Sequence, residues 1–212
     1  MAKRATRQRP KSSSRSDLKE RVVDAAIELA ETVGWSAVRL RAVAEQLGIP
    51  LAELQTHYRD LDGVADAWFV HAWQTMLAPP PDDFAQWPAA DRLHFVLMRW
   101  FDALAKHREV THQMLSEKTY LSHPHHWVPM IFNLSRTIQW VREAALLDAG
   151  GRRRQVEEVG LTAVFLATLA VWRRDDSDNQ DRTRDFLRRR LARADRTLAA
   201  LFRRRGLADP GE

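Results

Sequence analysis

Cysteine is absent from the 212 residues of the chain. Neither a disulfide nor a thiolate metal site can therefore form, which fits a reducing cytoplasm. No apolar run is expected to be long enough to cross a bilayer, because arginine and aspartate closely flank the most apolar stretch, Leu161–Trp172. The basic N-terminus lacks the apolar segment of a secretory signal, although its arginines and serines also fit an organelle-targeting peptide. We predict a cytoplasmic protein without a membrane span.

The motifs of common enzyme classes are also missing. The sequence has no glycine-rich phosphate loop, no HExxH helix and no nucleophile elbow. His123, His125 and His126 lie close together, but Pro124 stands among them and no carboxylate follows at a fixed spacing that would complete a metal site. We therefore expect no enzyme activity, no metal and no cofactor.

Two short helical patterns joined by a tight turn occupy residues 38–58. Gly48 stands where a helix C-cap favours a residue that tolerates positive φ, and Pro50 suits the first position of the next helix. Leu51 and Leu54 then supply the inner face of that second helix. The pattern predicts a helix-turn-helix, which can place its second helix in the major groove of DNA, and an ordinary corner between two helices is the alternative.

Positive charge is concentrated at the N-terminus. The first fifteen residues hold six basic residues and no acid, whereas the formal net charge of the whole chain is +5. The rest of the chain is therefore close to neutral. A basic arm beside a helix-turn-helix is the arrangement expected for phosphate contacts, and a solubilising tail is the alternative. We expect residues 1–15 to be disordered in the free protein.

Helical patterns cover the remainder of the chain, without a strand pattern or an internal repeat. Prolines interrupt the helices at residues 78–88, and Gly150 and Gly151 separate two long helical segments. The predicted fold is all-α with about nine helices. It comprises a three-helix helix-turn-helix domain at residues 16–61, followed at residues 62–212 by a connecting helix and a C-terminal helical bundle.

The last two predicted helices have unusual patterns. Residues 159–172 are apolar on all sides, and because one small domain rarely buries a whole helix, we predict a subunit interface there. The helix that starts near Asp181 carries a leucine stripe among many arginines. Its arginine-rich side is interpreted as a solvated face beside a dimer contact, and contact with anionic lipid is the alternative.

Aromatic and sulfur-containing side chains recur at helical spacing in the C-terminal half. Such residues are more often core than ligand contacts, but the chain is rich in tryptophan, with eight residues. We therefore predict an apolar pocket for a small apolar ligand. The candidate ligand contacts are Trp100, Phe101, Trp127, Met130, Trp140 and Phe165.

The N-terminal part resembles the TetR family of transcriptional regulators. The similar features are VVDAAIELAETVGW at residues 22–35, LRAVAEQLGI at residues 40–49, THY at residues 56–58, and a following helix that holds Trp68. The resemblance implies a repressor of transcription that is a homodimer through residues 152–205. It also implies a small-molecule pocket in the C-terminal bundle and a double-stranded DNA operator as partner.

The resemblance places the recognition helix at residues 50–57. The implied DNA contacts are Arg39, Arg41, Pro50, Gln55, Thr56, His57 and Arg59. Family members usually carry an aromatic residue where Gln55 stands and a lysine where Leu61 stands, and both usual residues touch phosphates. Gln55 can still donate a hydrogen bond, but Leu61 cannot attract a phosphate. We expect the three arginines to compensate, and Glu53 to accept from a cytosine amino group.

A second resemblance covers the segment Trp172–Leu191. It is similar to the C-terminal region of the lipid-binding accessory proteins of ubiquinone biosynthesis, which share the TetR fold but do not bind DNA with it. The similar residues are Asp175, Ser177, Thr183, Phe186, Leu187 and Arg190. Asp181 and Thr183 also suit a helix start, so capping chemistry is another source of the pattern. The alternative function is thus a lipid- or quinone-binding protein that no longer binds DNA.

Overall fold

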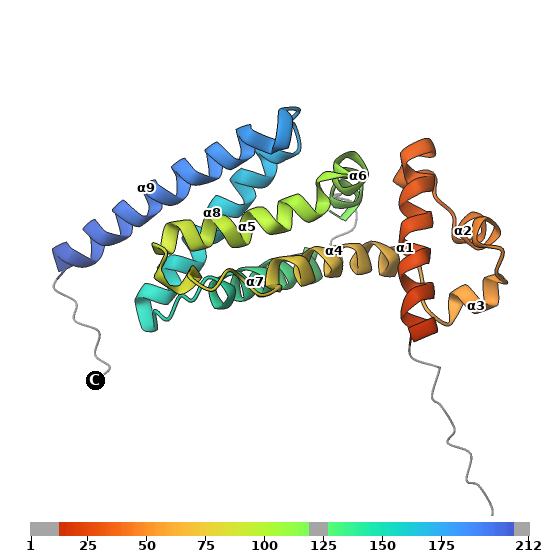
Figure 1. The fold of residues 1–212 in the computed structure, drawn as a ribbon, viewed down its shortest axis with the longest axis horizontal. Coiled ribbons are helices and arrows are strands. Elements are labelled where there is room, and N and C mark those ends of the chain that lie inside the picture. Colours follow the sequence, from red (N-terminus) through yellow and green to blue (C-terminus); the bar gives the residue numbers. More distant parts are fainter. Residues whose placement is uncertain (1–12, 119–126, 206–212) are drawn as a thin grey trace, which may run out of the picture. The chain divides into compact units, whose positions relative to one another are not determined.

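The computed structural model describes residues 13–118 and 127–205. Within these residues it contains α-helices and short 3-10 helices but no strand, so the predicted all-α fold is confirmed. The described α-helices are α1 (Ser13–Val33), α2 (Leu40–Leu47), α3 (Leu51–Gln55), α4 (Leu61–Leu77), α5 (Ala89–Ala105), α6 (Arg108–Lys118), α7 (Trp127–Ala144), α8 (Gly151–Trp172) and α9 (Asp181–Arg205) (Figure 1).

The chain divides into two compact units whose boundary falls between Val70 and His71, within α4. Helix α1 begins at Ser13, so the last three residues of the predicted basic arm are helical. The rest of that arm, residues 1–12, and the histidine cluster at residues 123–126 lie outside the described residues.

The N-terminal unit is built around α1 and the 3-10 helix η1 (Trp35–Ala37). Trp35 is almost completely buried, as are Val22 and Ala26 on the inner face of α1. Helix α2 ends at Gly48, whose φ of 66° lies in the left-handed region as its position predicted. The helix-turn-helix therefore forms, and α2 packs on both α1 and α3.

Two local predictions in this unit were wrong. Pro50 is the N-cap of α3 rather than its first helical residue, with an extended ψ of 141°. Leu51 becomes that first residue and is half-exposed, whereas Leu54 is fully buried. Because α3 has only five residues, it offers a single buried position instead of the inner face that was expected.

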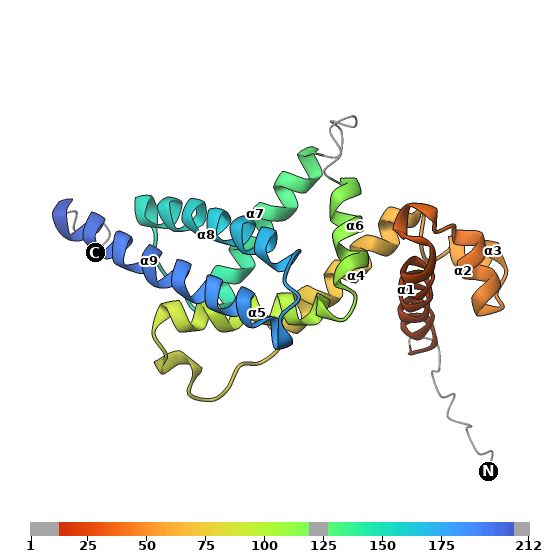
Figure 2. The ribbon, with the colours of Figure 1, turned by 90° about the horizontal axis from the view of Figure 1, so that it is seen from above.

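The C-terminal unit is a bundle in which α5 packs against α7 and α9, and α8 packs against α7 and α9. Helices α8 and α9 run side by side in both views (Figure 2). Helix α7 ends at Ala144, earlier than the predicted Ala149. Backbone hydrogen bonds from Leu146 to Glu143 and from Leu147 to Arg142 close the turn that ends it. Arg92 supports this turn, because its guanidinium donates hydrogen bonds to the carbonyl oxygens of Ala145 and Leu146 at 2.9 and 3.2 Å. Leu146 itself turns the chain with a φ of 55°.

Helix α8 is buried on one side only within this chain. Leu161, Phe165 and Trp172 face the core. Exposed residues recur on the other side at helical spacing, at positions 156, 159, 163, 166 and 170. Val159 is the most exposed large apolar side chain described, at 72%. The expectation that α8 is covered on every side therefore does not hold for the single chain.

The expectation that no apolar run is long enough to cross a bilayer was also wrong. Among the described residues, α8 is the one helix that is long and apolar enough to cross a membrane, judged by length and composition. Core helices of soluble proteins pass the same test. Here Glu157 and Glu158 of α8 form ion pairs with Arg142 of α7, which ties this helix into the bundle.

Candidate DNA-binding surface and ligand-binding region

The predicted DNA contacts lie on or beside the helix-turn-helix, and most of them are exposed. The exposed ones are Arg39, Arg41, Pro50, Gln55, Thr56 and Arg59, and His57 is half-buried. Leu54 anchors α3 from its inner side, because it is fully buried. The short helix can therefore present its polar positions to a partner while a single leucine holds it in place.

The three arginines of this surface differ in what they already bind. Arg39 donates to the carbonyl oxygens of Ser36 and Val38 at 2.8 and 2.9 Å. Arg59 pairs with Asp60 at 3.0 Å, although its side chain is 92% exposed. Arg41 makes no hydrogen bond or ion pair within the described chain. Of the three guanidinium groups, that of Arg41 is therefore the most available to bind a phosphate.

Tyr58 fastens the end of the recognition segment to α1. Its hydroxyl donates to the carbonyl oxygen of Lys19 at 3.1 Å, and its ring is buried. Burial, with a smaller contribution from Glu20, raises the pKa of Tyr58, so the phenol stays protonated as a donor. Thr56 closes α3, because its hydroxyl donates to the carbonyl oxygen of Glu53 at 2.7 Å. The side-chain oxygen of Thr56 can still accept a hydrogen bond.

Helix α4 starts immediately after this surface. The Asp60 carboxylate accepts a hydrogen bond from the backbone N–H of Gly63 at 2.9 Å, which is the geometry of an N-cap. Leu61 is the first residue of α4 and is half-buried. The position expected to carry a phosphate-binding lysine therefore lies at a helix start, but its side chain is apolar.

The predicted ligand contacts separate into three groups. Trp100, Phe101 and Phe165 pack together in the core, with ring centroids 5.1 to 5.8 Å apart. Trp140 lies apart from them on α7 and is 51% exposed. The side chains of Trp127 and Met130 lie outside the described residues. The structure thus brings three of the six together.

The aromatic core contains one polar atom without a partner. The indole N–H of Trp100 is buried and makes no hydrogen bond in the described chain. Leaving such a donor unsatisfied costs on the order of 1–3 kcal/mol. By contrast, the neighbouring Trp172 donates its indole N–H to the side-chain oxygen of Gln180 at 2.6 Å.

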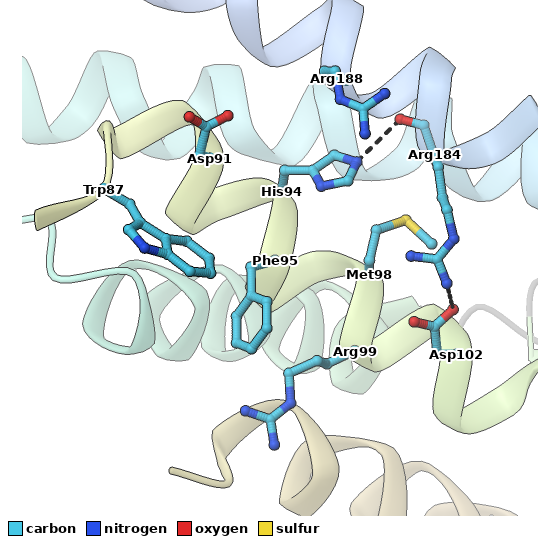
Figure 3. Close-up of a pocket in the computed structure, with 9 residues that line it drawn as sticks. All are labelled: Trp87, Asp91, His94, Phe95, Met98, Arg99, Asp102, Arg184 and Arg188. Carbon is cyan, nitrogen blue, oxygen red and sulfur yellow. Dashed lines mark hydrogen bonds and ion pairs between the residues drawn. The ribbon is translucent and has the colours of Figure 1, made fainter. Parts of the chain in front are cut away.

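A cleft that the sequence did not predict lies between α5 and α9 (Figure 3). It has a volume of about 310 Å³ and is lined by α5, by Trp87 and by two arginines of α9. The α5 residues that line it are Asp91, His94, Phe95, Met98, Arg99 and Asp102. Their helical spacing was a signal in the sequence that they share one face of α5, but it could not show that α9 and Trp87 complete a cleft there.

Three of the six residues shared with the second resemblance, Asp175, Ser177 and Thr183, form a polar cluster at the start of α9. The carboxylate of Asp175 is fully buried and accepts hydrogen bonds from the backbone N–H and the hydroxyl of Thr183. It also accepts from the backbone N–H and the hydroxyl of Ser177. Burial opposes ionisation, but the hydrogen bonds from Ser177 and Thr183 outweigh it and lower the pKa of Asp175. This cluster fixes the corner between α8 and α9.

Comparison with solved structures decides the family. The sequence is 40% identical to the TetR transcriptional regulator from Nitrosomonas europaea ATCC 19718, whose crystal structure matches with a TM-score of 0.76. The match covers 84% of this chain and 98% of that chain. The chain belongs to the TetR family. A TetR transcriptional regulator from Rhodococcus sp. RHA1 shares the fold, with a TM-score of 0.60 at 18% identity, and the match covers 87% of this chain and 97% of that one.

A family model described as COQ9 matches residues 158–197, in agreement with the second resemblance. No curated protein matches the sequence significantly. The COQ9 match covers most of α8, the corner that follows it and most of α9, and no other part of this TetR protein. That corner contains the buried carboxylate of Asp175 and its donors, so part of the similarity coincides with residues that cap α9.

Proposed function

We propose that this TetR protein is a cytoplasmic, homodimeric transcriptional repressor that binds an operator through the helix-turn-helix. The observation that carries the proposal is the exposure of Gln55 and Thr56 at the end of α3, which buries Leu54, together with an exposed Arg41 that makes no hydrogen bond or ion pair within the described chain. Each recognition helix would enter the major groove of one half-site. Arg39 and Arg41, with the basic arm, would hold phosphates, and Gln55 and Thr56 would donate to or accept from DNA groups.

Binding of DNA is tested with two variants of the proposed contact surface. Arg41→Ala is expected to weaken binding to the DNA upstream of the protein's own gene by about tenfold and to make the salt dependence less steep, because one phosphate contact is lost. Thr56→Ala is expected to weaken binding by a similar factor. Gel shift at several salt concentrations measures both effects. Thr32→Ala, which removes an exposed hydroxyl of α1, is the control and should bind as the wild type does. Unchanged binding in both test variants would contradict the proposed surface.

The exposed face of α8 is proposed as the centre of the dimer interface within residues 152–205. Val156, Val159 and Leu166 expose large apolar side chains on this face. Burying apolar surface contributes about 25 cal/mol per Å², which favours covering such a stripe with a second copy.

Val159→Arg should therefore dissociate the dimer, because a guanidinium would be buried without a partner at the interface. Sedimentation velocity measures the shift from dimer to monomer. Leu77→Arg, at an exposed apolar position of α4, is the matched control and should leave the dimer intact. A Val159→Arg protein that stays dimeric would place the interface elsewhere.

A ligand is proposed to act from the C-terminal bundle, where Trp100, Phe101 and Phe165 and the unpartnered indole N–H offer an apolar site with one donor. Ligand binding would favour one of two arrangements of the bundle and so change the spacing of the recognition helices.

The second candidate function is a lipid- or quinone-binding accessory role without DNA binding. The COQ9 match at residues 158–197 favours it, together with Leu61 and Gln55 at positions where the family usually contacts phosphate. Organic extraction of the purified protein followed by mass spectrometry tests it. Recovery of an apolar molecule in a protein that ignores operator DNA would support this function, and specific DNA binding without such a molecule would reject it.

A further inference from the structure

We propose that the cleft between α5 and α9 binds a small planar aromatic carboxylate, with Arg99 as the group that recognises the anion. None of Trp100, Phe101 and Phe165 lines the cleft, so it is distinct from the apolar site proposed above. Figure 3 shows the residues that do line it. Its volume of about 310 Å³ is at the lower end of ligand sites, which run from about 300 to 1,000 Å³. It therefore suits a ligand of one or two rings.

The apolar walls of the cleft favour a flat ring. Trp87 and Phe95 meet edge to face with ring centroids 5.5 Å apart, and Phe84 packs against both. Met98 adds a thioether, which packs favourably against aromatic rings. The indole N–H of Trp87 is already bonded to the Asp83 carboxylate at 3.0 Å, so Trp87 offers its ring rather than a donor. A planar ligand can pack on these rings in an offset or edge-to-face geometry.

The charges of the cleft favour an anion. Arg184 and Asp102 neutralise each other in an ion pair of 2.6 Å, and Gln180 also donates to that carboxylate at 2.7 Å. Arg188 pairs with Asp185 through an exposed contact, which is weak in water. Arg99 has no ion pair at all within the described residues.

Two other titratable groups of the cleft do not oppose a carboxylate at Arg99. His94 bonds to the backbone carbonyl oxygen of Arg184 at 3.1 Å. Burial lowers the pKa of His94 more than that hydrogen bond raises it. The positive charges of Arg188 and Arg184 lower the pKa further, and Asp91 raises it slightly, so the ring is neutral at pH 7. Asp91 is exposed and precedes Arg99 by eight residues, or about 12 Å along a helix. We therefore expect the ligand carboxylate to bind at the end of the cleft that holds Arg99, away from Asp91.

Arg99 also gives the cleft a direct connection to α4. Its guanidinium stacks over Phe95 at 5.3 Å and donates to the carbonyl oxygens of Ala78 and Pro79 at 2.6 and 3.4 Å. These carbonyls directly follow the last residue of α4, where a cation stabilises the end of a helix. Both bonds come from Nη1, so Nε and Nη2 can receive a carboxylate, and a shift of the guanidinium toward that carboxylate would weaken its hold on this end of α4. The consequence for DNA binding, since α4 continues into the helix-turn-helix unit, rests on the proposed function.

The test uses 1-naphthoate as probe and 1-naphthalenemethanol as its neutral counterpart, with the full-length protein. Binding is followed through the indole N–H signals in a ¹H–¹⁵N spectrum, assigned by single Trp→Phe variants. We expect the Trp87 signal to shift with a Kd of roughly 0.1–1 mM for the carboxylate, as for a ligand of this size. The alcohol should bind at least about tenfold more weakly, because a charge-assisted hydrogen bond is lost.

Two arginine variants locate the anion contact. Arg99→Gln should weaken 1-naphthoate binding by about tenfold or more. Arg189→Gln, at an exposed arginine of α9 that does not line the cleft, should leave the affinity unchanged. Equal affinities of Arg99→Gln and wild type, or of the acid and the alcohol, would overturn the proposal. Shifts at Trp100 and Trp172 with Trp87 unaffected would also overturn it by placing the ligand in the core. DNA binding is measured separately, so each of these failures leaves the repressor proposal standing.

Discussion

Replacing Asp175 by alanine is expected to lower the free energy of unfolding by about 3 kcal/mol, because four hydrogen bonds to a buried carboxylate disappear together. The backbone N–H and the hydroxyl of Thr183 are left without a partner in a buried position. Ser177 loses the same acceptor. Urea denaturation at fixed protein concentration measures the change, since the stability of the proposed dimer would depend on concentration.

The neighbouring residue supplies the control for this prediction. Asp176→Ala removes an exposed carboxylate next in the chain and should change the free energy of unfolding by less than about 0.5 kcal/mol. Because the pKa of Asp175 is lowered in the folded state, its ionised form stabilises the protein above the ordinary pKa of 3.8, and this contribution is lost as the pH falls through the folded-state value. The difference between wild type and Asp175→Ala should therefore shrink on acidification. A difference that is small at neutral pH would contradict the capping role.

Arg142→Met should destabilise the C-terminal unit by about 3 kcal/mol, because the buried carboxylate of Glu157 then keeps only the exposed Arg153 as its cation. Arg142 of α7 is 4% exposed and contacts Glu157 and Glu158 of α8 at 3.2 and 3.3 Å. It also donates to the carbonyl oxygens of Leu147 and Ala149 after the end of α7. The same guanidinium therefore joins two helices and the turn between them. Urea denaturation monitored by circular dichroism gives the loss.

The double variant Arg142→Met/Glu157→Met separates charge from packing. Removing both charges should restore part of the lost stability, because no carboxylate is left at the position of Glu157. Arg136→Met, at an exposed position of the same helix, should be close to neutral. If the double variant is as unstable as the sum of its single variants, the ion pair is not the source of the effect.

The fold was predictable because local patterns and tertiary packing agree. Gly48 ends α2 in the left-handed conformation as its position predicted, and α8 begins at Gly151, one residue before the predicted start. The early end of α7 was not predictable. The left-handed turn that ends it falls at Leu146 rather than at a glycine. Arg92, which donates to the carbonyl of Leu146, lies far from it in the sequence and reaches it only in the folded bundle.

The candidate sites were predictable only in part, because they also depend on contacts between residues that are distant in the sequence. Periodicity placed Trp100 and Phe165 in the apolar interior, where they meet with ring centroids 5.2 Å apart. It could not tell which face Trp140 would occupy, because that depends on how α7 packs. The cleft beside Arg99 was missed because its two walls come from α5 and α9, which are distant in the sequence. A resemblance in sequence likewise could not show that Asp175 is a helix cap rather than a ligand contact.

The departures at Gln55 and Leu61 make DNA binding the central question. The backbone still presents both positions as a phosphate contact would require: Gln55 is exposed on α3, and Leu61 is the first residue of α4. We expect Arg41 to replace the phosphate contacts that are missing at these two positions, because its guanidinium has no partner within the described chain.

The most direct test is the ratio of two affinities of the wild-type protein at physiological salt. One is for the DNA upstream of its own gene, and the other is for a scrambled duplex of the same length and composition. A repressor should prefer the upstream DNA by at least about 10³-fold, as specific DNA-binding proteins do. Equal affinities that both vanish with added salt would mean that only the phosphate backbone is bound, and would contradict the repressor function.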